Sequence, residues 1–118
     1  MNPKLQVYGI KNCDTVKKAL AWISQRQLET EFHDLKKEEL SKGLVAEWLS
    51  QIESGKLINR RSTTWRNLSD SQKTLTETSD LIQLIIEQPT LLKRPVLFHQ
   101  GVWSVGFDLQ DWQSRLIA

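Results

Sequence analysis

One residue of the chain has the chemistry of a strong nucleophile, and it lies where an apolar run gives way to a helical pattern. Cys13 is the single cysteine among 118 residues and stands in the stretch VYGIKNCDTVKKALAWI at residues 7–23. The thiolate is the reactive form of cysteine, and the unpaired N–H groups and positive dipole end of a helix N-terminus favour that anion. This position favours a reactive thiol, although most free cysteines are simply small buried hydrophobic residues.

Basic side chains form a second group with chemical potential. Arg60, Arg61 and Arg66 fall in a polar, turn-rich segment, and Arg94 directly precedes Pro95. The planar guanidinium group of arginine binds carboxylates and oxyanions through paired hydrogen bonds. One or two of these arginines near the thiol would create an anion site, whereas loop arginines are otherwise usually just solvated.

The same inventory argues against other chemistries. One cysteine forms neither an internal disulfide nor a thiolate zinc cluster, and His33 and His99 lack the paired spacing of metal ligands, so we expect ordinary strand histidines and no metal site. The opening residues lack the apolar stretch of a signal peptide, and LIQLII at 81–86 is too short to span a bilayer, which favours a cytoplasmic protein. A formal charge of +2 is too small for a general nucleic-acid binder.

The elements that must position Cys13 follow from the apolar periodicity. Residues 4–8 alternate in polarity and end at Gly9, which predicts a short strand followed by a loop. From Asp14 onward apolar residues recur at helical spacing, which predicts a helix with Cys13 at its N-terminus. A second strand is predicted at 30–35, and strand, helix, strand is the pattern of a right-handed parallel crossover.

The middle of the chain has a helical pattern. An amphipathic helix is predicted over residues 37–52, and the polar segment 55–72 admits only short helical pieces. Another helix is predicted with Thr78 or Ser79 as its cap, and Pro89 ends it.

The C-terminal part predicts a hairpin and a closing helix. Residues 95–107 read as two strands around a tight turn at 100–101, and Asp108 caps a short helix. The order of elements is that of an α/β, thioredoxin-like fold with a four-stranded mixed sheet. We therefore expect a single domain over residues 1–118 with a helical insertion at about 37–88.

Three separated segments resemble one protein family. YGIKNCDTVKKA, INRRSTTWRNL and KRPVLFHQGVWSVGF are similar, in that order and nearly end to end, to the YffB branch of the arsenate reductase and Spx family. The resemblance implies a thioredoxin-like sheet with an inserted helical subdomain and an active thiol in the loop before the first helix. These implications agree with the elements predicted from periodicity.

The resemblance also implies roles for individual residues. Cys13 matches the family's nucleophile, Arg94 matches the arginine before the hairpin, and Pro95 matches the cis proline that lies beside the thiol. An arginine of the middle segment should face the site as well. Alignment on the sequence TTW favours Arg61 for this role, whereas alignment on the preceding leucines favours Arg60, and we predict Arg61.

Two neighbours of the thiol are further candidate site residues, and the sequence departs from the family pattern at two places. Asn12 and Thr15 flank the thiol and are expected to offer donors to a bound anion. The arsenate reductases have a further arginine after the hairpin, where this chain reads SVGF through Phe107. Spx-type proteins commonly carry a CxxC pair, but the residue three after Cys13 is Val16, so a disulfide switch is ruled out.

These observations predict a monothiol, glutathione-dependent thiol/disulfide reductase. Without a resolving cysteine, an outside thiol must release any mixed species on the protein, and glutathione is the obvious candidate. Glutathione is thus expected as a co-substrate, with a disulfide or an oxyanion as substrate and no bound cofactor. One alternative is a Spx-like, non-catalytic adaptor that binds RNA polymerase, and a second is arsenate reduction, which the missing arginine disfavours.

Overall fold

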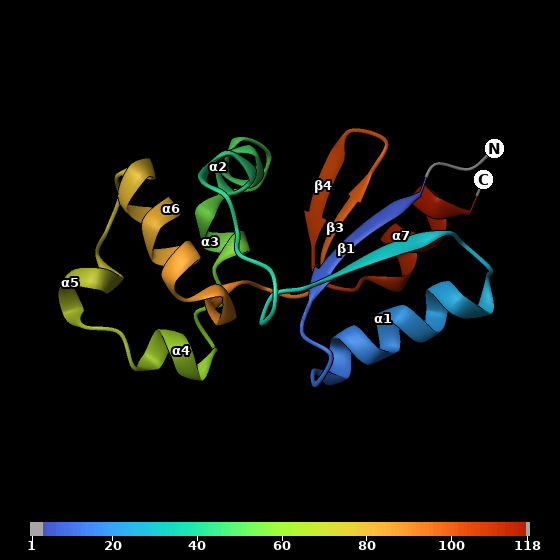
Figure 1. Ribbon diagram of the computed structural model, residues 1–118, viewed down its shortest axis with the longest axis horizontal. Coiled ribbons are helices and arrows are strands. Elements are labelled where there is room, and N and C mark those ends of the chain that lie inside the picture. The colour runs from blue at the N-terminus through green and yellow to red at the C-terminus, as the bar shows by residue number, and fades with distance from the viewer. Residues whose placement is uncertain (1–3, 118) are drawn as a thin grey trace. The chain divides into compact units, whose positions relative to one another are not determined.

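The computed structural model describes residues 4–117, which form two compact units (Figure 1). The first unit combines the chain up to Asp34 with the chain from Arg94 onward, and the second is Leu35–Lys93. The helical insertion predicted at 37–88 falls inside the second unit. The assignment of the whole chain to one domain stays a prediction.

A four-stranded mixed sheet organises the first unit, as predicted. Its strands are β1 (Leu5–Gly9), β2 (Thr30–Asp34), β3 (Val96–His99) and β4 (Val102–Val105). They are ordered β2-β1-β3-β4, with β1 parallel to β2 and antiparallel to β3, and β3 antiparallel to β4.

The crossover from β1 to β2 runs through α1 (Asp14–Gln25), because two parallel strands need a long connection. The C-terminal end of β1 lies very close to α1. A Cβ atom added at Gly9 would lie 2.9 Å from Cγ2 of Val16, a distance too short for a side chain. Glycine at the end of β1 therefore permits the close approach that sets where Cys13 stands.

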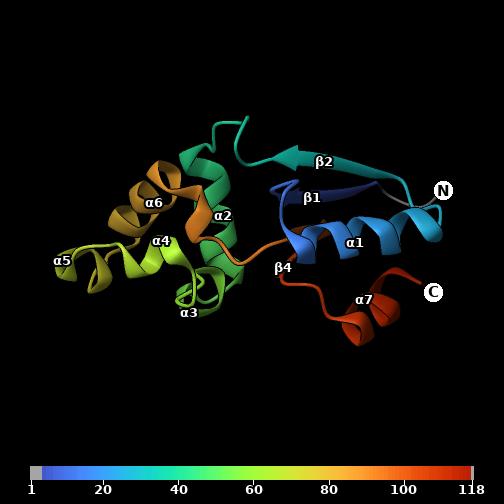
Figure 2. The ribbon, with the colours of Figure 1, turned by 90° about the horizontal axis from the view of Figure 1, so that it is seen from below.

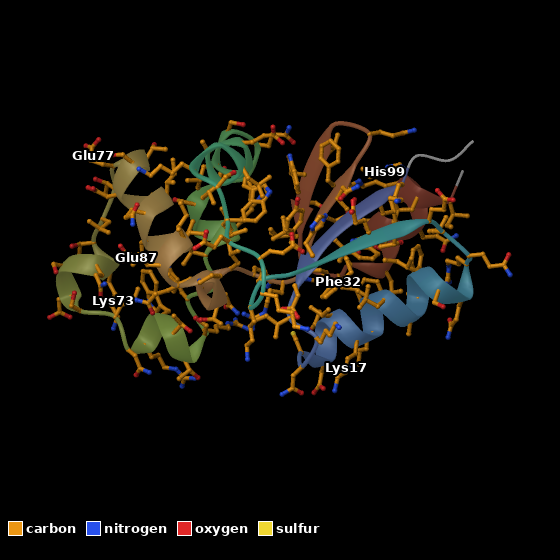
Figure 3. All side chains as sticks on the ribbon, in the orientation of Figure 1. Lys17, Phe32, Lys73, Glu77, Glu87 and His99 are labelled. Atoms are coloured by element: carbon orange, nitrogen blue, oxygen red, sulfur yellow. The ribbon has the colours of Figure 1, made fainter. Side chains whose placement is uncertain are left out.

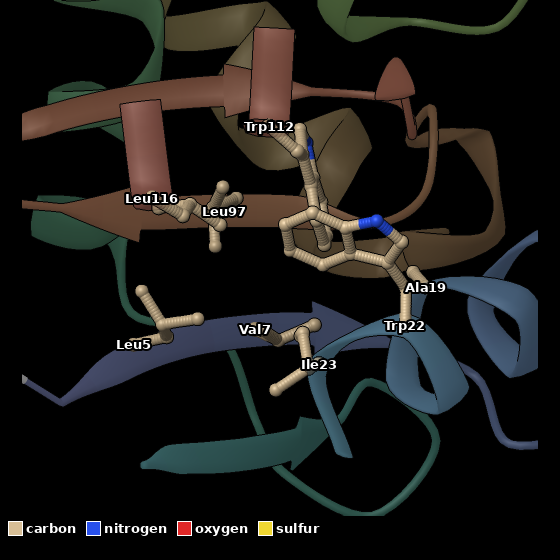
Figure 4. Close-up of a cluster of buried hydrophobic side chains, with 8 residues drawn as sticks. All are labelled: Leu5, Val7, Ala19, Trp22, Ile23, Leu97, Trp112 and Leu116. Atoms are coloured by element: carbon tan, nitrogen blue, oxygen red, sulfur yellow. The ribbon is translucent and has the colours of Figure 1, made fainter. Parts of the chain in front are cut away.

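The core of the first unit lies under one face of the sheet. Figure 2 shows α1 and α7 (Leu109–Leu116) on the same side of the strands. Side chains from β1, β3 and both helices form one buried cluster (Figure 4), which comprises Leu5, Val7, Ala19, Trp22, Ile23, Leu97, Trp112 and Leu116. Each large apolar side chain removed from water stabilises the fold by about 1.5–3 kcal/mol, so this cluster holds α1 firmly on the sheet.

The C-terminal hairpin and helix form as predicted. Gln100 and Gly101 have φ angles of 49° and 83°, the pair of positive values that a two-residue hairpin turn matched to the strand twist requires. The side chain of Asp108 accepts a hydrogen bond from the backbone N–H of Asp111 at 3.0 Å, which caps α7.

The second unit is helical. Its elements are α2 (Lys42–Gln51), α3 (Ser54–Leu57), α4 (Thr63–Arg66), α5 (Asp70–Lys73), α6 (Thr78–Glu87) and a 3-10 turn (Pro89–Leu91). The short helices α3 and α4 confirm the short pieces predicted around Leu57 and Trp65, and α5 is a further short helix. No helix formed by residues 4–117 is long and apolar enough to cross a membrane.

Two helix starts in this unit differ from the prediction. The helix predicted over 37–52 begins only at Lys42, because the hydroxyl of Ser41 accepts a hydrogen bond from the N–H of Leu44 at 3.1 Å and fixes the cap there. The cap of α6 is Glu77 rather than Thr78 or Ser79, and Glu77 forms no side-chain cap hydrogen bond. The apolar pattern located both helices but did not locate their first residues.

Candidate active site around Cys13

Cys13 stands at the N-terminus of α1, as predicted. It is the cap residue of the helix, with extended backbone angles of φ −134° and ψ 123°, and its carbonyl accepts the N–H of Lys17 at 2.9 Å. The side chain is partly exposed. The thiol is thus both reachable from solvent and next to the unpaired N–H groups of the first helical turn.

The surroundings of the sulfur lower its pKa. Burial raises the pKa of the Cys13 thiol, but the backbone N–H of Val16, the hydrogen bond and positive charge of Arg94, and the backbone N–H of Thr15 together outweigh that effect. These donors therefore stabilise chiefly the thiolate, which is the nucleophilic form.

Arg94 and Pro95 come from the segment just before β3. The Arg94 side chain is half-buried and donates a hydrogen bond to the Cys13 sulfur, so the structure brings these two predicted site residues together. The peptide bond between Arg94 and Pro95 is cis. Pro95 is buried, and its carbonyl accepts the N–H of Gly106 at 2.9 Å, which joins this segment to the end of the hairpin.

The residues beside the thiol contribute through their backbone more than through their side chains. Thr15 acts through its N–H group, whereas its side chain is exposed. Asn12 lies exposed in the turn before Cys13, and its role as a donor stays a prediction. Val16 was not predicted as a site residue, yet its N–H is the strongest of the groups that lower the pKa of Cys13. Its place three residues after a helix cap is the signal that would have found it.

The candidate arginines of the middle segment lie in the second unit, between α3 and α4. The guanidinium carbon of Arg60 is 5.4 Å from the centre of the Trp65 ring, a cation–π distance. Arg61 has an exposed side chain, and its backbone N–H donates to Oδ1 of Asn59 at 3.0 Å. The assignment of Arg61 rather than Arg60 to the thiol site stays a prediction.

Comparison with known proteins decides the family, because the model of the ArsC family matches residues 8–114. The chain belongs to the ArsC family. A protein of Haemophilus influenzae described only as uncharacterized is 38% identical over 110 residues, which cover 93% of this chain and 96% of that protein. The solved structure of a YffB protein is 34% identical with a TM-score of 0.90 and covers 95% of this chain and 98% of the other.

Other relatives of this ArsC-family chain have different descriptions. The global transcriptional regulator Spx of Streptococcus agalactiae is 32% identical over 107 residues, which cover 89% of this chain and 77% of the regulator. The arsenate reductase of Vibrio cholerae has a TM-score of 0.77 at 13% identity, covers 98% of each chain and so shares the fold. The chain is thus an arsenate reductase-like protein with the α/β, thioredoxin-like fold of its family.

Phe107 ends the SVGF stretch after the hairpin, the stretch where the resemblance implies a further arginine in arsenate reductases. Its ring centre lies 4.7 Å from that of Trp112 and 6.2 Å from that of Trp22, in edge-to-face arrangements. The side chain packs against the core cluster. In this member of the ArsC family, this position therefore contributes to packing and carries no charge.

The two histidines occupy strands, as predicted. The ring of His33 in β2 stacks on that of Tyr8 at 4.3 Å, and its Nε2 is hydrogen-bonded to Oε1 of Gln6 at 2.6 Å. His99 is the last residue of β3, and burial together with a nearby arginine lowers its pKa. Within residues 4–117, no group of three or more His, Cys, Asp or Glu side chains is placed to hold a metal ion.

Proposed function

We propose that this protein is a monothiol, glutathione-dependent thiol/disulfide reductase. The observation that carries the proposal is the placement of Cys13 at the start of α1, where backbone N–H groups and Arg94 lower the pKa of the thiol. Because the chain has one cysteine, a mixed disulfide at Cys13 must be resolved by a thiol from outside.

The proposed cycle has two thiol–disulfide exchanges. In the first, the Cys13 thiolate attacks the glutathione sulfur of a glutathionylated substrate; a disulfide between Cys13 and glutathione forms, and the substrate leaves as a thiolate that takes a proton from water. In the second, the thiolate of another glutathione attacks the glutathione sulfur of this disulfide, which releases oxidised glutathione and restores the Cys13 thiolate. The net reaction turns substrate disulfide and glutathione into substrate thiol and oxidised glutathione.

The groups around Cys13 serve both exchanges. A lowered pKa increases the fraction of attacking thiolate in the first step and makes Cys13 a better leaving group in the second. Following the family resemblance, Arg94 and Arg61 bind the carboxylates of glutathione, whose extended backbone runs beside Pro95. Asn12 and Thr15 add donors to this anion.

A coupled assay tests the proposal. Reduction of the mixed disulfide of glutathione and 2-mercaptoethanol is followed through oxidised glutathione formation for the native protein, Cys13→Ser and Lys18→Ser, the last an exposed position on the same helix. The native protein and Lys18→Ser accelerate the reaction, and Cys13→Ser falls to the uncatalysed rate. Full activity in Cys13→Ser would end the proposal.

A Spx-like adaptor is the second candidate, favoured by the 32% identity with the Streptococcus agalactiae regulator over 107 residues. In that case the protein would bind RNA polymerase without using its thiol. Capture of purified RNA polymerase by immobilised Cys13→Ser protein, together with a native protein that fails the coupled assay, would favour the adaptor over the reductase.

A further inference from the structure

The second unit contains a small pocket between its short helices and α6. Its volume is about 30 Å³, which is room for about two water-sized groups. Ile58, Trp65 and Leu81 supply apolar lining, and Arg60, Gln72 and Lys73 supply polar lining. No carboxylate is among the side chains that line it. The pocket thus offers donors and positive charge to a small guest.

The two cations of the pocket lie in a strongly basic part of the chain. Residues 54–75 hold five basic side chains against one acidic side chain, Asp70, although the whole chain has a formal charge of only +2. Within residues 4–117, neither Arg60 nor Lys73 takes part in an ion pair. Within the described residues, no carboxylate therefore forms an ion pair with either cation.

The polar groups of the pocket are held in place. The Arg60 guanidinium carbon is 5.4 Å from the centre of the Trp65 ring, and Nζ of Lys73, labelled in Figure 3, donates to the carbonyl of Arg66 at 3.4 Å. Oε1 of Gln72 accepts the N–H of Ser69 at 2.9 Å in the capping box of α5. With its oxygen engaged, the Gln72 side chain has its NH₂ group left to donate.

We propose that this pocket binds a small oxyanion of the phosphate class, independently of the reaction at Cys13. Two cations and an amide donor at this pocket supply the positive charge and the hydrogen-bond donors that the acceptor oxygens of a phosphoryl group require. The anion is either free phosphate or the phosphoryl group of a small phosphomonoester. In this proposal, Arg60 binds the anion in the pocket of the second unit and does not bind the substrate of the thiol.

Titration with inorganic phosphate, followed by the backbone amide and tryptophan indole signals in NMR spectra at constant ionic strength, tests this proposal. The signals of Arg60, Trp65, Gln72 and Lys73 shift and saturate in the native protein and equally in Cys13→Ser. Lys73→Gln and Arg60→Gln each weaken binding by about tenfold, as the loss of one charge-assisted hydrogen bond implies. Lys56→Gln, an exposed cation of the same basic segment outside the pocket, leaves the affinity unchanged.

Two results of this titration would contradict the proposed phosphate site. Shifts that rise linearly without saturation, or an equal loss of affinity in Lys56→Gln and Lys73→Gln, would show a diffuse charge effect and overturn the site. A second titration with O-phosphoserine separates the two sources. Tighter binding of O-phosphoserine than of inorganic phosphate assigns the site to a phosphomonoester, and equal or weaker binding assigns it to the free anion.

Discussion

At the residue scale, the proposed chemistry depends on a small set of groups that stabilise the Cys13 thiolate. The thiolate of Cys13 has two backbone N–H donors and one arginine, and together they outweigh the effect of burial on its pKa. Because the pKa is lower in the folded chain than in the unfolded chain, ionised Cys13 stabilises the folded state above the unfolded pKa. That contribution is lost as pH falls through the folded pKa.

Replacement of Arg94 should make the thiol less reactive. Arg94→Met removes the side-chain hydrogen bond and the positive charge while keeping an extended apolar stem, so the pKa of Cys13 rises. We expect alkylation of Cys13 by iodoacetamide at pH 7 to slow by about threefold to tenfold. Arg26→Met, which removes an exposed charge after the last residue of α1, serves as the control and keeps the native rate. A native rate in Arg94→Met would contradict the role of Arg94.

A matched pair of variants separates the two arginines of the middle segment. If Arg61 binds a glutathione carboxylate, Arg61→Ala raises the KM for glutathione by about tenfold, as the loss of a charge-assisted hydrogen bond implies. Arg60→Ala leaves this KM unchanged, because the Arg60 side chain lines the pocket of the second unit. Steady-state kinetics at varied glutathione concentration measure both values, and the reverse pattern would assign the role to Arg60.

Part of the site was predictable from residue types and part was not. A nucleophile at a helix start and an arginine before a proline leave a mark in the sequence, and the resemblance singled out Cys13, Arg94 and Pro95. The Val16 N–H is marked only by its place three residues after the helix cap, because every non-proline residue has such a group. The apolar side chain of Val16 indicates only that this residue is buried.

At the element scale, the predictions succeeded where the pattern of apolar residues decides the structure. The crossover around α1 and the hairpin at Gln100 and Gly101 follow from periodicity and turn chemistry, and both formed. The starts of α2 and α6 were wrong because a cap is selected by local backbone geometry among several polar candidates. Ser41 was one such candidate, but it lies within the longer amphipathic pattern of residues 37–52.

The close approach of β1 to α1 gives a test of how the thiol is positioned. Gly9→Ala places a Cβ 2.9 Å from Val16 Cγ2, so α1 must shift or the side chain must repack. We expect a loss of about 1–3 kcal/mol in the free energy of unfolding and slower alkylation of Cys13. Gly43→Ala is the control, because its Cβ meets nothing within 4 Å on α2 and alanine stabilises a helix by up to about 1 kcal/mol. Urea unfolding that ranks Gly9→Ala as the more stable variant would contradict this account.

The aromatic cluster around Phe107 predicts that restoring an arginine does not restore arsenate chemistry. Phe107→Arg places a charge beside the rings of Trp22 and Trp112 and should destabilise the fold by about 1–4 kcal/mol. Phe107→Leu keeps an apolar side chain and should cost less. Urea unfolding measures both losses. A stable Phe107→Arg protein that oxidises glutathione in response to arsenate would show that this position faces the site instead.

At the scale of the whole molecule, the α/β order of elements and the helical insertion were predictable because they follow from the order of periodic segments along the chain. The second unit spans Leu35–Lys93 and contains residues 37–88, and the description of this segment as an insertion in a single domain stays a prediction. At its C-terminal end the residues beyond 88 belong to the second unit because Ile58 pairs with Leu92 and the Lys93 N–H donates to the Leu57 carbonyl at 2.8 Å. Such pairing joins segments distant in sequence, which local periodicity does not report.

The most direct test of the central claim is the pH dependence of Cys13 alkylation in the folded protein and in urea. The chain has one cysteine, so the reaction reports on that thiol alone. The account predicts a midpoint for the folded protein below that of the unfolded protein, because the N–H groups of Val16 and Thr15 and the Arg94 guanidinium act only in the folded state. Coincident curves, or a folded midpoint above the unfolded one, would contradict the claim that the fold activates this thiol.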